Sequence, residues 1–257
     1  MFTAAIAVAL LALDPQAKPE RPTGSPPATE AAPGDKPAPA NEPAKAKPTG
    51  DETAIRLFNG VSLEGWKVFV PEGSADGLWS VEDGNLVCAG NPIGYLVTDR
   101  EFESFELTLE WRFDPKKGAG NSGVLLRVQR PDKVWPTSIE AQLHSLNAGD
   151  IWNIGEVPMK PDASRTEGRR TRKLQETNEK PLGEWNRYRI VVDGGKLELY
   201  VNDLLQNSAT DVQVRPGRIA LQSEGSHIEF RKIELRELGG RAPASAPARA
   251  PAKPEKR

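Results

Sequence analysis

The sequence predicts an all-β domain built from two stacked antiparallel sheets, a sandwich or jelly roll. Apolar and polar residues alternate from Phe105 to Phe113, which is the period-two pattern of a strand with one buried face. Shorter runs of the same kind recur through the middle of the chain, which has almost no stretch with the period of an amphipathic helix. Many strands without helices in one domain favour two packed sheets.

Residues suited to turns separate the expected strands. Asp83-Gly84 and Asp193-Gly194-Gly195 can adopt the positive φ angles of tight hairpins, so each should join two antiparallel neighbours. The apolar phase changes within the last strand, which predicts a β-bulge near Arg231-Lys232. The stretch 147–181 breaks the rhythm and is expected to form loops over one face. Besides 105–113, the expected strands are 78–81, 84–88, 123–129, 138–145, 185–192, 196–201, 218–222 and 227–235.

Composition divides the chain into one folded domain and three flanking segments. All six tryptophans lie in 51–238, whereas ten of the 23 prolines lie in 14–50 and four in 239–257. We therefore expect a jelly-roll domain over 51–238, a Pro/Ala-rich disordered linker over 18–50 and a basic Pro/Ala-rich disordered tail over 239–257. Residues 1–17 begin with an uncharged apolar run that is too short to span a membrane and is typical of a signal peptide.

These features predict an exported protein, periplasmic or associated with the cell envelope, with no transmembrane span once the signal is removed. The net charge of −2 argues against nucleic acid as a partner. Cys88 is the only cysteine, so neither a disulfide framework nor a cysteine-based zinc cluster is available, and we expect it to pack as a small apolar residue. A cationic run in the insertion favours a solvated loop, with an anion site as the alternative: Arg165, Arg169, Arg170, Arg172 and Lys173.

The strand expected at 138–145 carries an unusual polar face. Alternation directs Ile139, Ala141 and Leu143 to the core and the intervening side chains to the opposite face. With neighbouring strands, that outer surface would gather Arg127, Gln129, Glu140, Gln142, His144, Gln222 and Glu224. Such a set suits a sugar, because hydroxyls pair with planar hydrogen-bonding side chains and C–H faces stack on rings such as Trp152 or Trp135. The alternative is the ordinary solvated side of a sheet.

The chemistry of this face differs from that of an ordinary glycosidase. A retaining glycosidase needs two carboxylic acids about 5 Å apart, whereas the strand offers Glu140 with an amide and an imidazole at the next alternate positions. Direct displacement at an anomeric carbon is therefore disfavoured. A histidine beside a carboxylate is better suited to removing a moderately acidic C–H proton and protonating a leaving oxygen.

Six short motifs occur in order across the expected domain and together resemble the 3-keto-disaccharide hydrolase domain family. They lie at 57–66 (LFNG through GW), 79–84 (WSVEDG), 120–124 (GNSGV), 139–142 (IEAQ), 183–186 (GEWN) and 217–225 (GRIALQSEG). The resemblance implies a concanavalin A-like jelly roll and activity on glycosides oxidised at C3. A C3 ketone acidifies the C2 proton, so a base can remove it and the C1 glycosidic oxygen can leave. Some members of the family use a divalent cation, so the resemblance leaves a metal ion open as a cofactor and assigns it no ligand.

The leading hypothesis is an exported hydrolase or lyase that cleaves 3-keto-glycosides, including 3-keto-disaccharides. Glu140 and His144 would act as acid and base, with Glu224 as a second carboxylate. The residues expected to bind the carbohydrate are Asn121, Arg127, Gln142, Trp152 and Gln222. The alternatives are a non-catalytic carbohydrate-binding module of the cell envelope and a purely structural envelope protein. A pocket around one sugar ring would favour the enzyme, an open groove the binding module, and a flat polar sheet neither.

Overall fold

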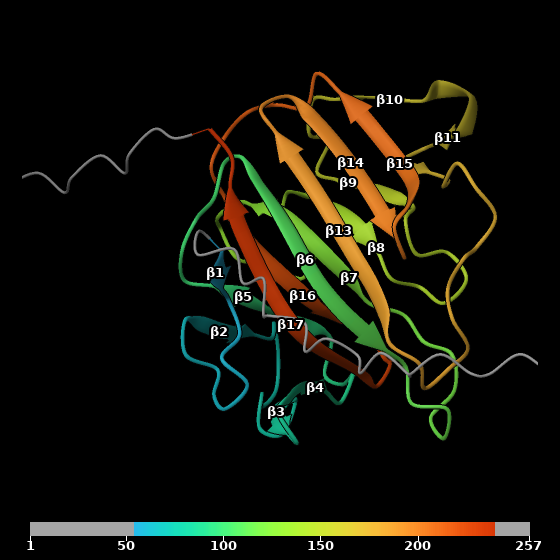
Figure 1. Ribbon diagram of the computed structural model, residues 1–257. Coiled ribbons are helices and arrows are strands. Elements are labelled where there is room, and N and C mark those ends of the chain that lie inside the picture. Colours follow the sequence, from blue (N-terminus) through green and yellow to red (C-terminus); the bar gives the residue numbers. More distant parts are fainter. Residues whose placement is uncertain (1–53, 240–257) are drawn as a thin grey trace, which may run out of the picture. The chain divides into compact units, whose positions relative to one another are not determined.

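Two antiparallel sheets pack face to face in the computed structural model, which describes residues 54–239 (Figure 1). The single helical element in this part of the chain is a 3-10 turn, η1, at Ala163–Arg165. The predicted all-β jelly-roll sandwich is thus confirmed. The segments expected at 1–17 and 18–50, and the tail beyond Gly239, lie outside the described residues. No helix within 54–239 is both long and apolar enough to cross a bilayer.

The first sheet has nine strands and forms the layer nearer the viewer in Figure 1. The short strand β1 (Ile55–Arg56) pairs with β17 outside the main path. In spatial order the other strands are β10 (Lys160–Pro161), β15 (Leu204–Thr210), β14 (Lys196–Val201), β13 (Asn186–Asp193), β6 (Phe105–Arg112), β17 (Ile228–Glu237), β4 (Asn85–Cys88) and β3 (Trp79–Glu82).

The second sheet has eight strands and lies behind the first in the same view. Its outer face, turned away from the first sheet, carries the candidate site. In spatial order its strands are β11 (Thr166–Glu167), β12 (Arg170–Thr171), β9 (Ile151–Ile154), β8 (Ser138–Gln142), β7 (Gly123–Val128), β16 (Arg218–Ser223), β5 (Gly94–Thr98) and β2 (Trp66–Phe69).

The main core lies between the sheets and follows from the alternation in the sequence. Every second residue of β6 is fully buried, and Trp111 meets Tyr188 of β13 with ring centroids 5.4 Å apart. Ile139, Ala141 and Leu143 belong to the same core, as predicted. Cys88 is also buried there, and burial raises the pKa of its thiol to about 11, so it is an inert packing residue.

The turns and the bulge form where the sequence indicates. Asp83 (φ 49°) and Gly84 (φ 77°) close the hairpin between β3 and β4, and Gly194 (φ 53°) lies in the turn between β13 and β14. The pairing of β17 with β6 shifts register between Arg231 and Glu234, where Lys232 has φ 50°. The bulge lets both apolar phases of β17 reach the core.

The prediction that 147–181 forms only loops is wrong. The segment contains β9 to β12, and β9 pairs with β8 so that Trp152 lies opposite Glu140. These strands have two to four residues, which is too short for a period-two pattern to stand out. Strand β5 was missed for a different reason: it is buried on both faces, so it reads as a short apolar run.

The expectation that Arg127 faces the outer surface is also wrong. The pairing of β7 with β16 shifts register between Arg218 and Ala220, and Arg127 has φ 52°, so a β-bulge reverses the alternation at this point. The buried guanidinium instead donates hydrogen bonds to the carbonyl oxygens of Glu103, Gln213 and Gly194. Arg127 therefore holds loops at one end of the sandwich and is not part of the candidate site.

Candidate functional site

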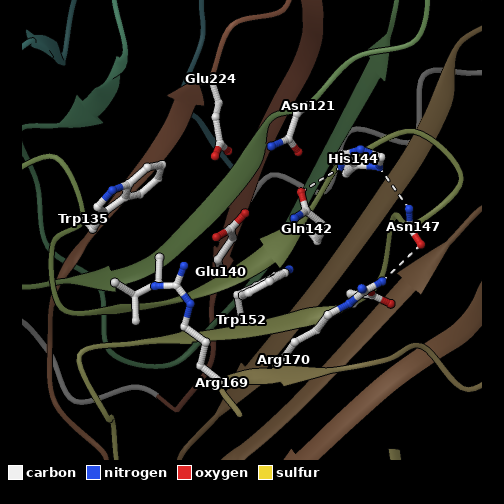
Figure 2. Close-up of a pocket in the computed structure, with 12 residues that line it drawn as sticks. Asn121, Trp135, Glu140, Gln142, His144, Asn147, Trp152, Arg169, Arg170 and Glu224 are labelled. Carbon is white, nitrogen blue, oxygen red and sulfur yellow. Dashed lines mark hydrogen bonds and ion pairs between the residues drawn. The ribbon is translucent and has the colours of Figure 1, made fainter. Parts of the chain in front are cut away.

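A cavity of about 310 Å³ opens on the outer face of the eight-stranded sheet, over β8, β9 and β12 (Figure 2). This volume lies at the lower end of the range for small-molecule sites. Six of the eight residues predicted for the site line it: Asn121, Glu140, Gln142, His144, Trp152 and Glu224. Gln222 lies beside Glu140, and Arg127 is elsewhere.

The strand register brings the central side chains into one row. Glu140 of β8 pairs with Trp152 of β9, and Trp152 pairs in turn with Arg170 of β12. Directly opposed residues of antiparallel strands share a face and lie close together. The insertion expected to form loops therefore builds one wall of the site.

Gly123 of β7 makes room for two polar side chains above the sheet. A Cβ at this position would overlap Gln222 Oε1 and would lie only 2.6 Å from Glu140 Oε1. Because glycine has no side chain, Glu140 and Gln222 can approach each other across β7. This close approach gives a physical reason for the glycine in the Asn-Ser-Gly motif.

Two carboxyl groups share the cavity and influence each other. Glu140 is only 5% exposed, and burial raises its pKa to about 8, helped by the negative charge of Glu224 and opposed by Arg169 and Gln222. Burial also raises the pKa of Glu224, against the charges of His144 and Arg169. Figure 2 shows both carboxyl groups pointing into the cavity. The pair can hold a proton near neutral pH, which suits proton transfer.

His144 reaches the cavity from a turn and not from a strand. The side-chain Oε1 of Gln142 accepts hydrogen bonds from the backbone N–H groups of Leu143 (2.9 Å) and His144 (2.8 Å), which ends β8 at Gln142. The exposed imidazole of His144 lines the cavity, with Nδ1 3.0 Å from Asn147 Nδ2. Among residues 54–239 no hydrogen-bond partner is found for the amide nitrogen of Gln142.

The two tryptophans of the cavity have different surroundings. The guanidinium carbons of Arg169 and Arg170 lie 5.1 and 5.8 Å from the centroid of Trp152, so cations cover this ring. Trp135 is 39% exposed at the rim of the cavity (Figure 2). Trp135 therefore offers the more accessible ring surface.

The loop that carries Trp135 is anchored to the sheet. Asp132 forms an ion pair with the buried Arg218, and Tyr95 Oη donates a hydrogen bond to the same carboxylate at 3.3 Å. The hydrogen bond of Arg218 is the main reason that the pKa of Asp132 is lowered. A ring on such a loop is held in place for binding.

Sequence reasoning missed two arginines, one amide and one carboxylate of the site: Arg169, Arg170, Asn147 and Asp150 all line the cavity. Arg169 is exposed in the turn between β11 and β12, as expected for a solvated loop, whereas Arg170 is half-buried on β12, where that interpretation is wrong. The sequence signal for both arginines was the cationic run. Only the pairing of β12 with β9 shows that Arg170 lies beside Trp152, which in turn lies opposite Glu140.

The acidic and imidazole groups of the site do not fit a divalent metal ion. Within residues 54–239, no three His, Cys, Asp or Glu side chains are grouped closely enough to hold one. The cation that acts on both glutamates is Arg169.

The fold and cavity define a class, the jelly-roll sandwiches with a polar site on one sheet. Bacillus licheniformis β-glucanase shares the fold, with a TM-score of 0.51 at 10% identity over 73% of this chain and 100% of that chain. Within this class the chain belongs to the 3-keto-alpha-glucoside-1,2-lyase-like domain family, whose model matches residues 53–236. The family predicted from the motifs is thus confirmed.

Individual relatives agree with this assignment. The chain is 25% identical over 239 residues to a 3-keto-disaccharide hydrolase of Bacteroides thetaiotaomicron, covering 74% of this chain and 80% of the relative. It also resembles a solved structure, described as a glycosyl hydrolase, from Parabacteroides distasonis ATCC 8503. That match has a TM-score of 0.54 at 26% identity and covers 73% of this chain and 95% of the other.

Proposed function

We propose that this protein cleaves 3-keto-glycosides by removing the C2 proton and expelling the C1 glycosidic oxygen. The observation that carries the proposal is the buried Glu140, with a pKa raised to about 8, beside Arg169 and His144 in one cavity. A base with a raised pKa is matched to a C–H group acidified by a neighbouring ketone. A cavity of about 310 Å³ also favours an enzyme over a flat binding face.

The reaction can be assigned to side chains of this chain. The ionised carboxylate of Glu140 takes the proton from C2, and the electron pair of that C–H bond moves to the C3 oxygen as an enolate. The guanidinium of Arg169 is placed to stabilise this negative charge. The enolate then re-forms the ketone as the C1–O bond breaks. The leaving oxygen, which accepts a hydrogen bond from His144, takes the proton that Glu140 removed from C2. Water adds to the resulting enone in a hydrolase, whereas the enone departs in a lyase.

Unpartnered amides provide the contacts for sugar hydroxyls. Asn121 Oδ1 and Gln222 Oε1 are buried and accept no hydrogen bond from any described residue. A buried acceptor without a donor is costly, so a hydroxyl at each position would be stabilising. Gln142 Nε2 supplies a donor, and Trp135 supplies the apolar surface against the C–H face of the ring.

The proposal is tested with the full chain and matched disaccharides that differ only by a ketone at C3. The 3-keto compound should be cleaved and the parent disaccharide should survive, because without the C3 ketone the C2 proton is not acidic enough for Glu140 to remove. Glu140→Gln should lower turnover of the 3-keto compound by roughly a hundredfold or more. Binding without cleavage would instead support a carbohydrate-binding module, and cleavage of the parent would refute the proposed chemistry.

We also propose that the protein is exported, on the evidence of the apolar run in residues 1–17. The proposal predicts a mature chain that begins near Ala17 when the protein is isolated from the periplasm or medium of the producing cells. Mass spectrometry of the N-terminal peptide measures this. An intact N-terminus on protein confined to the cytoplasm would contradict export.

A further inference from the structure

We infer that Asn147 and Arg170 are positioning residues that fix the tautomer of His144, so that its proton lies on Nε2. Nδ1 of His144 contacts the Ser145 carbonyl and Asn147 Nδ2. Within residues 54–239 no protein partner is found for Nε2, which is the nitrogen left for a ligand. The catalytic consequence of this inference rests on the proposed function, whereas the tautomer itself can be measured without any substrate.

The chain of contacts begins at a buried carboxylate. Asp150 Oδ2 accepts a hydrogen bond from Arg170 Nε at 2.7 Å, and the ion pair to the terminal nitrogen of the guanidinium is 2.6 Å long. The other oxygen of Asp150 accepts the backbone N–H of Lys173 at 2.7 Å. The side chain of Asp150 is only 2% exposed, so the orientation of Arg170 is strongly restrained.

Arg170 in turn determines which way the Asn147 amide points. A guanidinium can only donate hydrogen bonds, and Arg170 Nη2 lies 3.2 Å from the Asn147 side chain, so the atom facing it must be Oδ1. The amide nitrogen Nδ2 is then the atom that lies 3.0 Å from His144 Nδ1. The choice between the two amide orientations is thus made by the hydrogen-bonding partners.

The orientation of the amide decides the state of the imidazole. Asn147 Nδ2 can only donate, so His144 Nδ1 must accept with its lone pair, and the neutral ring carries its proton on Nε2. The carbonyl of Ser145 lies 3.0 Å from Nδ1 and would favour the opposite tautomer. That tautomer would turn an N–H group of His144 against an N–H group of Asn147. The same Nδ2 also lies 3.4 Å from the Ser145 carbonyl, so Asn147 can serve both acceptors.

This tautomer separates the roles of the two groups. With Nε2–H presented to the cavity, neutral His144 is set to donate a hydrogen bond to the leaving glycosidic oxygen and so to stabilise the charge that develops there. Glu140 is left as the base at C2. The tautomer thus decides which role belongs to Glu140 and which to His144, a choice that the residue types alone leave open.

The test uses ¹⁵N NMR of the full chain labelled at histidine, at a pH where both imidazoles are neutral. The sequence holds two histidines, His144 and His227, and the spectrum of His144→Ala assigns their signals. In the unmodified protein His144 should show an unprotonated Nδ1 and a protonated Nε2. Protonated and unprotonated ring nitrogens have well separated ¹⁵N chemical shifts. Asn147→Asp replaces the donor with an acceptor of the same shape beside Arg170, so it should move the proton of His144 to Nδ1. A protonated Nδ1 in the unmodified protein would overturn the inference.

A matched variant makes the result specific. Asn85→Asp makes the same chemical change in β4 of the other sheet and should leave the tautomer of His144 unchanged. Thermal unfolding of each variant establishes that it is folded. A folded Asn147→Asp protein with the tautomer of the unmodified chain would overturn the inference.

Turnover measures the catalytic consequence separately. With a 3-keto-glycoside, Asn147→Asp should reduce kcat by roughly a hundredfold, because the nitrogen facing the leaving oxygen has lost its proton. Unchanged turnover with a reversed tautomer would refute the role of His144 as hydrogen-bond donor to the leaving oxygen. If the unmodified protein turns over no 3-keto-glycoside, the proposed function fails, while the NMR result still decides the inference on the tautomer.

Discussion

At the scale of single residues, two glutamates and one arginine determine the protonation of the cavity. Glu140 has a pKa raised to about 8, mainly by burial and then by Glu224, while the charge of Arg169 lowers the pKa of both carboxyl groups. Removing the negative charge of Glu224 and removing the positive charge of Arg169 should therefore move the proton affinity of Glu140 in opposite directions.

Glu140 should make the folded protein less stable as the pH rises. Its folded pKa of about 8 exceeds the ordinary value of 4.5, so between these values the unfolded chain loses the proton while the folded chain keeps it. The free energy of unfolding should therefore fall across this window, by up to a few kcal/mol since each pKa unit corresponds to about 1.4 kcal/mol.

Glu140→Gln removes this penalty and should be more stable than the unmodified chain at pH 9 but not at pH 4. Urea unfolding at both pH values measures the difference. Equal stabilities of the two proteins at pH 9 would show that the carboxyl of Glu140 is not held neutral by its surroundings.

The pH dependence of cleavage should respond to the neighbours of Glu140. Because the ionised carboxylate is the base, kcat/KM for a 3-keto-glycoside should rise with pH up to about 8. Glu224→Gln removes a negative charge and should shift this rise to lower pH. Arg169→Gln removes a positive charge and should shift it to higher pH, with slower turnover as well. Shifts in the same direction for both variants would contradict the assignment of Glu140.

At the scale of elements, β8 combines a packing face and a chemical face. Leu143, just beyond its end, lies fully buried in the core between the sheets, whereas Glu140 faces the cavity. Gly123 on β7 belongs to the chemical face, since the atoms nearest to a Cβ there would be side-chain atoms of Gln222 and Glu140.

Substitutions on the two faces of β8 and its neighbour should have different effects, one on stability and the other on turnover. Leu143→Ala removes buried methyl groups and should cost about 2–5 kcal/mol of the free energy of unfolding. Gly123→Ala should leave most of that free energy but reduce turnover, because Gln222 and Glu140 must move apart. Chemical denaturation together with kcat on a 3-keto-glycoside distinguishes the two. A Gly123→Ala protein with full activity would show that this spacing is unimportant.

How much the sequence predicts depends on the length and burial of each element. Strands such as β6 and β13 have eight residues and one solvated face, so their alternation is plain. Strand β12 has two residues, and the bulge at Arg127 reverses a face through pairing with β16, which lies far along the chain. Glu140, Gln142 and Glu224 could be placed from local patterns. Arg169 could not, because the pairing of β12 with β9 brings its turn to the cavity, and Asn147 could not, because it reaches the cavity from the irregular turn after β8.

At the scale of the whole molecule, the described residues contain the paired strands and the cavity that the proposal needs. The family match covers 53–236, within the domain expected at 51–238. We therefore predict that a chain of residues 51–238 folds alone, with a melting temperature within a few degrees of that of the full protein. Thermal unfolding followed by circular dichroism measures this. Failure of the shortened chain to fold would show that the flanking segments contribute to the domain.

The central claim is that cleavage begins with removal of the proton at C2. A 3-keto-disaccharide carrying deuterium at C2 measures this step directly, since breaking a C–D bond is slower than breaking a C–H bond. Cleavage of the deuterated compound should be several-fold slower than that of the ordinary one whenever proton transfer limits the rate, as it should in Arg169→Gln, where the enolate is less stabilised. Equal rates for the two compounds, in both the unmodified protein and Arg169→Gln, would contradict the proposed elimination.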